Sequence, residues 1–231
     1  MKAVAPVTVV AALSIFASTA FFVPVVAPTA TGDSETMILP FHRYNTAGEI
    51  PAPWFRKHTV LYGRVVKVVD GDTFRIRHYP LYPLVRSSSY QGRLSDHTIS
   101  VRIYGVDAPE LGKFGKPAMP EAETAKQYTA NLVDGKIVRV KLLRRDQYNR
   151  AVGKVTVRHT IPIFKTDVSI GLAKKGYATL YTGGGAEYDG KKDRFEKEIA
   201  TARRRRRGIW KNGEALSPAE FKKQLKAGNK K

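Results

Sequence analysis

The stretch Arg102–Glu110, RIYGVDAPE, sets one arginine and two carboxylates around a proline turn, in a chain with twenty surplus positive charges. A second acidic turn, VVDGDTF at 68–74, contains Asp72. Asp-Gly between β-branched runs is typical of a hairpin, and Asp107 before Ala-Pro is typical of an Asx turn, so each acid alone fits a turn former. Together they allow another interpretation, because neighbouring strand ends can bring Asp72 and Asp107 within reach of one cation.

The ion expected at such a pair is a hard divalent cation, Ca²⁺ or Mg²⁺, because these ions prefer oxygen ligands. The bent VDAP backbone, residues 106–109, can add a carbonyl oxygen, with water filling the remaining positions. Glu110, just past the turn, could accept a proton from a water near the ion. Arg102 and Arg150 could bind phosphate oxygens with paired donors, although either arginine alone also fits a surface charge or an ion-pair partner.

Short segments with alternating or β-branched residues predict the strands that must position these side chains. Three strands are expected over 59–70, 73–78 and 99–103, and two more over 136–143 and 151–159. Five short strands with a helix between the third and the fourth indicate a closed barrel of the oligonucleotide-binding (OB) type. A split βαβ sheet is the alternative.

About three helices are expected to pack outside this barrel, which gives an α+β fold. The first lies within 117–135, with Pro120 in its first turn; the second lies within 166–176, capped by Thr166 or Asp167; the third ends before Gly208. The connection over residues 79–96 is expected to be a surface loop, and its role is left open.

Composition narrows the classes of partner and of site. The chain has 231 residues, 40 Lys and Arg, 20 Asp and Glu and no cysteine, which excludes disulfides and thiolate metal sites. Its positive charge favours polyanions such as nucleic acid or acidic lipid. Almost half of the surplus charge lies in residues 203–231, where Arg203–Arg207 fits a solvated helix face, a backbone-binding patch or a membrane-surface patch.

The N-terminus predicts attachment to a membrane. Residues 7–27 are uncharged and long enough to cross a bilayer as one helix, so residues 1–30 are expected to be an anchor, or alternatively a cleaved signal peptide. Residues 31–57 are then expected to be a linker, 58–212 the folded domain and 213–231 a basic tail.

Five motifs resemble the staphylococcal nuclease (thermonuclease-like) family, in order and spacing, over residues 58–210. These are VVDGDTF, RIYGVDAPE, DQYNR, GLAKKGYA and RRGIW. Longer stretches such as RRDQYNRAVGKVTVR are similar to a subgroup of membrane-anchored, mitochondrion-associated endonucleases known from fungi. The resemblance implies a single-pass membrane protein with a mitochondrial location, whereas the alternative of a cleaved signal peptide predicts secretion.

The same resemblance assigns roles to residues that match the family's motifs. It implies one Ca²⁺, in preference to Mg²⁺, held by Asp72, Asp107 and the backbone carbonyl of Ala108, although the family often has Thr where Ala108 stands. It implies Glu110 as general base and Arg102 and Arg150 as the groups that stabilise the phosphate transition state. Nucleotide-binding residues would be Tyr148 and, by a looser match, Tyr181.

The sequence therefore predicts a membrane-anchored, Ca²⁺-dependent nuclease that hydrolyses phosphodiester bonds of DNA or RNA by internal cleavage, without an obligate protein partner. The competing prediction is a catalytically inactive OB module that binds nucleic acid at a membrane. Retained acids and arginines favour the enzyme, since a binding module has no need of them.

Overall fold

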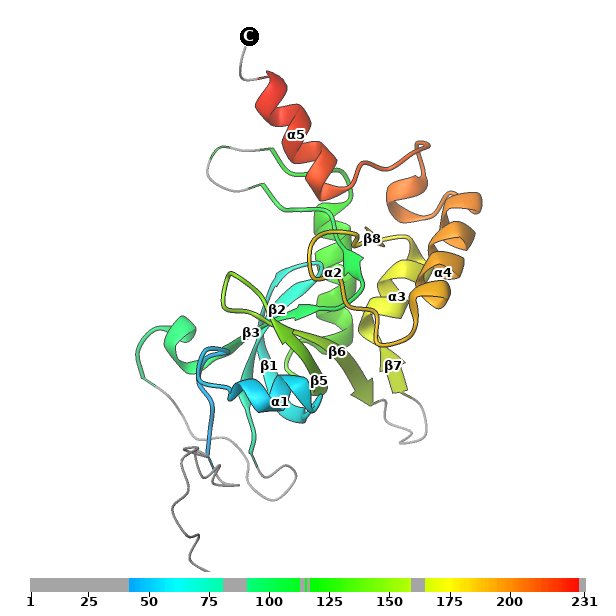
Figure 1. Cartoon of the computed structure of the whole chain (residues 1–231). Helices are drawn as coiled ribbons and strands as arrows, with labels where there is room; N and C mark the ends of the chain where they lie inside the picture. The colour runs from blue at the N-terminus through cyan, green and yellow to red at the C-terminus, as the bar shows by residue number, and fades with distance from the viewer. Residues whose placement is uncertain (1–41, 81–90, 113–114, 116, 159–164, 229–231) are drawn as a thin grey trace, which may run out of the picture. The chain divides into compact units, whose positions relative to one another are not determined.

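Five strands close into a barrel in the computed structural model, which describes residues 42–80, 91–112, 115, 117–158 and 165–228 (Figure 1). The barrel strands are β1 (Val60–Asp70), β2 (Thr73–His78), β3 (Ile99–Ile103), β5 (Ile137–Arg145) and β6 (Ala151–Arg158). Antiparallel pairings join β3, β2, β1, β5 and β6 in that order, and a parallel pairing of β3 with β6 closes the ring. The predicted five-stranded barrel is confirmed, and the open split sheet is excluded.

The alternation of the strands explains the core. Ile99, Val101 and Ile103 of β3 are fully buried, whereas the residues between them are partly exposed. The same alternation in β5 buries Val138 and Val140. Since successive side chains of a strand point to opposite faces, one face of each strand fills the barrel.

Further elements extend this framework. They are α1 (Ala52–Arg56), the 3-10 turns η1 (Leu94–His97) and η2 (Gly208–Trp210), β4 (Val106–Asp107), β7 (Lys165–Asp167), β8 (Thr179–Leu180) and α5 (Pro218–Gly228). Strand β7 pairs with β6 outside the ring, and β4 pairs with β8 to form a separate two-stranded ladder. This ladder fixes the position of Asp107.

The three expected helices are present as α2 (Ala122–Val133), α3 (Val168–Lys175) and α4 (Lys192–Arg204). Helix α3 begins as expected, since Asp167 caps it by accepting a hydrogen bond from Ile170 N, and Gly176 ends it in the left-handed region. Helix α2 begins later than its proline predicts. Glu121 adopts a φ of 62°, so the regular helix starts only at Ala122.

Residues before the first strand also belong to the folded part. Tyr44, Ala47, Ile50 and Phe55 are buried in the main hydrophobic core, and α1 contacts β5. The folded part therefore includes residues on the N-terminal side of residue 58, where the sequence pattern places its boundary. The reason is spacing, because these apolar residues are too scattered among prolines and polar residues to give a periodic signal.

The expected membrane segment at residues 7–27 lies outside the described residues. Among the helices that the structure does describe, none combines the length and the apolar character needed to span a bilayer.

Candidate active site

Three chain segments meet at one end of the barrel because of the strand register. Thr73 at the start of β2 pairs with Arg102 of β3, and Arg102 pairs in turn with Val152 of β6. The residues just before these strands, Asp72 before β2 and Arg150 before β6, therefore flank the β3 position occupied by Arg102. Positions far apart in the sequence are adjacent here because the barrel is closed.

The hairpin between β1 and β2 is held tightly against its surroundings. Thr129 of α2 donates a hydrogen bond to Gly71 O at 2.6 Å. A Cβ atom at Gly71 would lie 2.8 Å from the Cβ of Ala108 and 3.0 Å from that of Ala125, so any larger residue would push the two segments apart. This close approach places Asp72 beside Ala108, whose backbone N lies 3.5 Å from Asp72 Oδ2.

Asp72 and Asp107 share one arginine. Nη2 of Arg102 lies 2.5 Å from Asp107 Oδ1 and 3.4 Å from Asp72 Oδ2. Asp72 is only 7% exposed, and its Oδ1 accepts a hydrogen bond of 2.8 Å from the Thr73 hydroxyl. The backbone carbonyl of Asp107 accepts a hydrogen bond from the Thr179 hydroxyl of β8. Two carboxylates are thus fixed close to each other in a mostly buried position.

One guanidinium does not neutralise this pair. Burial, together with the Asp72 carboxylate, raises the pKa of Asp107 to about 6, even though Arg102 acts in the opposite direction. Burial lowers the pKa of Arg102, but the Asp72 and Asp107 carboxylates outweigh it, so that pKa lies above its usual value. The ionised form of Asp107 is therefore disfavoured, first by burial and then by the Asp72 carboxylate, and a bound cation would relieve both effects.

The donor set fits a hard divalent cation. Asp72 and Asp107 present carboxylate oxygens, and the backbone of Ala108 lies next to them. Within the described ranges, no three His, Cys, Asp or Glu side chains gather in an arrangement that could hold a metal ion. A cation at this position would therefore complete its shell with backbone and water oxygens, as Ca²⁺ commonly does.

Glu110 lies in a different environment from the two aspartates. Its side chain is about half exposed, and Lys222 Nζ of α5 lies 2.5 Å from Glu110 Oε1. The backbone carbonyl of Glu110 accepts a hydrogen bond from Met119 N at 3.0 Å, which anchors the loop after β4. Glu110 is close enough to Asp107 to contribute to the raised pKa of that residue.

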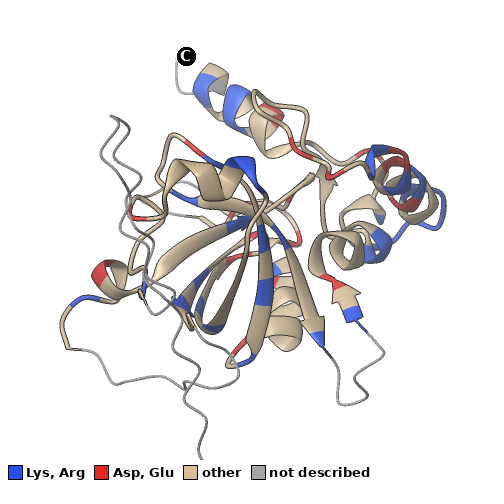
Figure 2. Ribbon diagram, turned by 60° about the horizontal axis from the view of Figure 1, so that its bottom comes forward, with Lys and Arg blue, Asp and Glu red and all other residues tan. Residues whose placement is uncertain are grey.

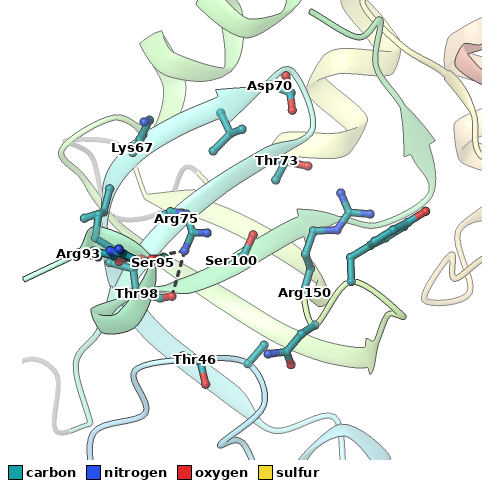
Figure 3. Close-up of a pocket in the computed structure, with 15 residues that line it drawn as sticks. Thr46, Lys67, Asp70, Thr73, Arg75, Arg93, Ser95, Thr98, Ser100 and Arg150 are labelled. Atoms are coloured by element: carbon teal, nitrogen blue, oxygen red, sulfur yellow. Dashed lines mark hydrogen bonds between the residues drawn. The ribbon is translucent and has the colours of Figure 1, made fainter. Parts of the chain in front are cut away.

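Arg150 is positioned by its own loop. Asp146 Oδ1 accepts hydrogen bonds from the backbone N of Tyr148 and of Arg150, both at 2.9 Å, and Asp146 Oδ2 binds Arg150 Nε at 2.7 Å. Figure 3 shows the Arg150 guanidinium at one end of a surface pocket that it shares with Thr73. Since Thr73 also bonds Asp72, this pocket adjoins the acidic pair.

Both predicted nucleotide-binding tyrosines lie beside an arginine. The ring of Tyr148 is 5.2 Å from the Arg150 guanidinium carbon, and that of Tyr181 is 4.7 Å from the Arg102 guanidinium carbon. Tyr148 is 70% exposed and can meet a base in solution. Tyr181 is held by a hydrogen bond from its backbone N to Gly105 O, so it packs on Arg102.

Four residues of this site have no role in the sequence prediction. Thr73 donates to the Asp72 carboxylate, Thr179 donates to the backbone carbonyl of Asp107, Asp146 fixes Arg150, and Lys222 binds Glu110. Asp146 could have been found from the sequence. It precedes Tyr148 by two residues and Arg150 by four, and an aspartate that accepts hydrogen bonds from backbone amides shortly after it is typical of an Asx turn. Lys222 has no such local signal, since 112 positions separate it from Glu110.

Known proteins resemble this chain over most of its length. Residues 100–212 match the family model described as staphylococcal nuclease homologue. The chain is 38% identical over 183 residues to endonuclease Htp3 of Saprolegnia parasitica, an alignment that covers 79% of this chain and 85% of that protein.

Two further relatives carry the name probable endonuclease LCL3. The protein of Komagataella phaffii is 38% identical over 200 residues, covering 80% of this chain and 84% of its own length. The protein of Emericella nidulans is 37% identical over 210 residues, covering 82% and 74% respectively. The resemblance that the five sequence motifs indicate is confirmed: the chain belongs to the staphylococcal nuclease homologue family.

Proposed function

We propose that the protein is a metal-dependent phosphodiesterase that cleaves DNA or RNA internally by hydrolysis. The observation that carries the proposal is the buried pair of Asp72 and Asp107, bridged by Arg102 at the end of the barrel where Arg150 also lies. Family membership supports the reaction class, and the names of the relatives support internal cleavage.

Asp72, Asp107 and the backbone carbonyl of Ala108 would hold the ion. The set supplies few protein ligands of irregular geometry, which suits Ca²⁺ better than Mg²⁺, since Mg²⁺ demands a near-ideal octahedron. When bound, the ion attracts the phosphate and offsets the negative charge that develops on its oxygens. Charge balance supports this assignment, because Arg102 alone leaves the pKa of Asp107 raised.

Arg102 and Arg150 would bind the non-bridging oxygens of the scissile phosphate. Arg102 contacts both aspartates through one nitrogen, Nη2, of a group that carries five donors, so it can bind phosphate while keeping these contacts. Asp146 holds the Arg150 guanidinium in place before substrate arrives. Both charges are thus oriented in advance, which makes them effective in a transition state.

Glu110 would act as the general base. A water attacks phosphorus in line with the leaving oxygen, and its proton passes to the Glu110 carboxylate. The P–O bond to the leaving group breaks, and the leaving oxygen takes up a proton from solvent to become a hydroxyl. The Lys222 contact has to open or shift for this transfer, because an ammonium group at 2.5 Å competes for the same carboxylate oxygen. The exposure of both side chains allows such a shift.

We also propose that the uncharged segment at residues 7–27 attaches the enzyme to a membrane, by inference from its length and composition. Carbonate extraction of membranes from cells that express the full chain tests this. An anchored chain stays in the pellet, whereas a chain processed as a secreted protein is found in the medium, shortened at its N-terminus.

The test of the reaction uses the purified chain with circular single-stranded and double-stranded substrates. A circular nucleic acid can be cut only by internal cleavage. Linear products in the presence of Ca²⁺, and no products in the presence of a chelator, therefore support the proposal. Binding without cleavage under every divalent ion would instead support the non-catalytic OB module, and cleavage in chelator would contradict the metal requirement.

A further inference from the structure

A basic surface region begins at Arg150 and extends away from the pair of Asp72 and Asp107. It is a surface pocket of about 790 Å³ over the outer faces of β1, β2 and β3. Its walls come from the segment before α1, from η1 and from the loop between β5 and β6. Figure 3 shows Lys67, Arg75 and Arg93 on one side of this pocket and Arg150 on the other.

The lining of the pocket is suited to a polyanion. The lining contains four basic side chains, Lys67, Arg75, Arg93 and Arg150, and a single carboxylate, that of Asp70. The pocket is also lined by serine and threonine residues, namely Thr46, Thr73, Ser95, Thr98 and Ser100. Cationic groups interleaved with hydroxyl donors are the groups that most often contact phosphate and sugar in nucleic-acid complexes.

Part of this pocket is rigid before any ligand binds. Nη1 of Arg75 donates to the Thr98 hydroxyl at 3.2 Å and contacts Thr98 O at 3.4 Å. The Thr98 hydroxyl in turn donates to Leu94 O, at 2.5 Å. These bonds tie η1 to β2, so they hold the segment that carries Arg93 against the barrel.

Lys67 and Arg93 differ from Arg75, because both are exposed. They present charge to the solvent at the wall of the pocket, whereas Arg75 is partly buried and serves the local fold as well. The connection after β2, to which the sequence assigns no role, thus supplies one of the pocket's cations through its described part.

The position of the pocket indicates what it binds. Arg150 lies both in the proposed active site and in the pocket wall, and Tyr148, 70% exposed, lies in the same wall. Proteins of the OB type bind roughly 4–16 nucleotides of single strand, using a basic groove and aromatic side chains that stack on bases. A strand whose phosphate is held by Arg150 must therefore continue over a neighbouring surface.

We propose that the pocket of Lys67, Arg75 and Arg93 binds the sugar-phosphate backbone of a single-stranded nucleic acid next to the bond that is cleaved. This inference rests on the proposed function, because the proposed function places the cleaved phosphate, and hence the neighbouring backbone, beside Arg150. A single strand is the proposed occupant in preference to a duplex, because barrels of the OB type bind single strands with basic grooves and stacking aromatic side chains, and Tyr148 lies in the wall of this pocket.

The test is charge reversal at the two exposed cations, Lys67→Glu with Arg93→Glu. The matched control is Arg194→Glu with Lys197→Glu, which changes net charge equally on exposed residues of α4, across the barrel from η1 (Figure 1). Figure 2 shows that basic residues occur on the barrel strands as well as on the C-terminal helices, so the control separates a local effect from a global one.

Binding of a labelled single strand of about 12 nucleotides is measured in chelator, where no cleavage is expected. The pocket variant should bind about tenfold more weakly or worse, and the slope of log K against log salt should fall by roughly 1.4, which corresponds to two lost phosphate contacts. The control variant should stay within about twofold of the wild type. Equal losses in the two variants would overturn the proposal, as would equal losses for a duplex of the same sequence.

A second readout separates this proposal from the proposed function. Cleavage in Ca²⁺ is compared for the long strand and for a nucleoside phosphodiester too short to reach Lys67. The ratio of kcat/KM for the long to the short substrate should fall about tenfold in the pocket variant, and an unchanged ratio would overturn the inference. If the wild type cleaves neither substrate, the proposed function fails, while the binding measurement still decides on the pocket.

Discussion

The two halves of the candidate active site are built in different ways. Asp72, Asp107 and Arg102 are mostly buried and held by strand pairing and hydroxyl bonds, so the barrel fixes their geometry. Glu110 is half exposed and meets Lys222 from a helix near the C-terminus. In the proposed mechanism, metal and phosphate binding would therefore depend on the fold itself, whereas proton transfer would depend on a surface contact that solvent screens and that can change.

The largest effect should follow from loss of a buried carboxylate. Asp107→Asn should reduce kcat by about 10³-fold or more, because the cation worth several kcal/mol of charge stabilisation would no longer be held. It should also abolish the rise in melting temperature that Ca²⁺ gives the wild type. Steady-state kinetics and thermal melting with and without Ca²⁺ check this, and an active variant that Ca²⁺ still stabilises would contradict the assignment.

A smaller effect is expected at the arginine of the same half. Arg102→Lys keeps the charge but loses the planar fork, so kcat should fall by about 10²- to 10³-fold, as for removal of one preorganised donor. Ca²⁺ binding, measured by calorimetry, should persist, since both aspartates remain. Loss of Ca²⁺ binding together with activity would show that Arg102 acts on the ion site and not on the phosphate.

The exposed half should respond less strongly. Glu110→Gln should lower kcat by about 10²-fold, the lower end of the range for a general base, and should leave the Kd for a single strand within about twofold. The kinetic assay and a binding assay in chelator measure the two quantities separately. A parallel loss of binding and turnover would mean that Glu110 has a different role.

The pH dependence of stability distinguishes the buried half in another way. In chelator, the folded chain keeps the proton of Asp107 up to about pH 6, whereas the unfolded chain loses it near the usual value of 3.8. Folding of the wild type therefore becomes less favourable as the pH rises through this window, by at most about 3 kcal/mol. Asp107→Asn lacks this titration, so its stability relative to the wild type should increase from pH 4 to pH 6 in denaturant melts. A constant difference would refute the raised pKa.

The smallest effect concerns the contact between Glu110 and α5. Lys222→Ala should raise kcat by less than about fivefold, because an exposed ion pair is weak. Lys223→Ala, the neighbouring exposed lysine of α5, is the matched control and should not change kcat. A decrease in kcat for Lys222→Ala alone would show that Lys222 assists the reaction.

The difference between the two halves also explains which features of the site can be predicted from the sequence. The strands and the acidic turns have local signals, and the barrel that the strands predict is confirmed. The structure also brings Asp72, Asp107 and Arg102 together at one end of this barrel. Their roles in the reaction stay predictions until the variants above are measured.

Features that depend on distant packing have no such signal. The parallel closure of β3 on β6 and the burial of Tyr44 and Ile50 follow from shape matching within the whole domain. The pairing of Glu110 with Lys222 joins segments 112 positions apart, and the pocket beside Arg150 needs η1 folded onto β2. Local periodicity contains none of this information.

The most direct test of the account is a Ca²⁺ titration of the chelator-treated chain, with bound ion measured by calorimetry and strand cleavage measured in parallel samples. The account predicts one ion per chain, a cleavage rate that rises in proportion to occupancy, and neither signal in Asp72→Asn. Cleavage that is already complete before Ca²⁺ is added, or that returns equally in Asp72→Asn, would contradict it.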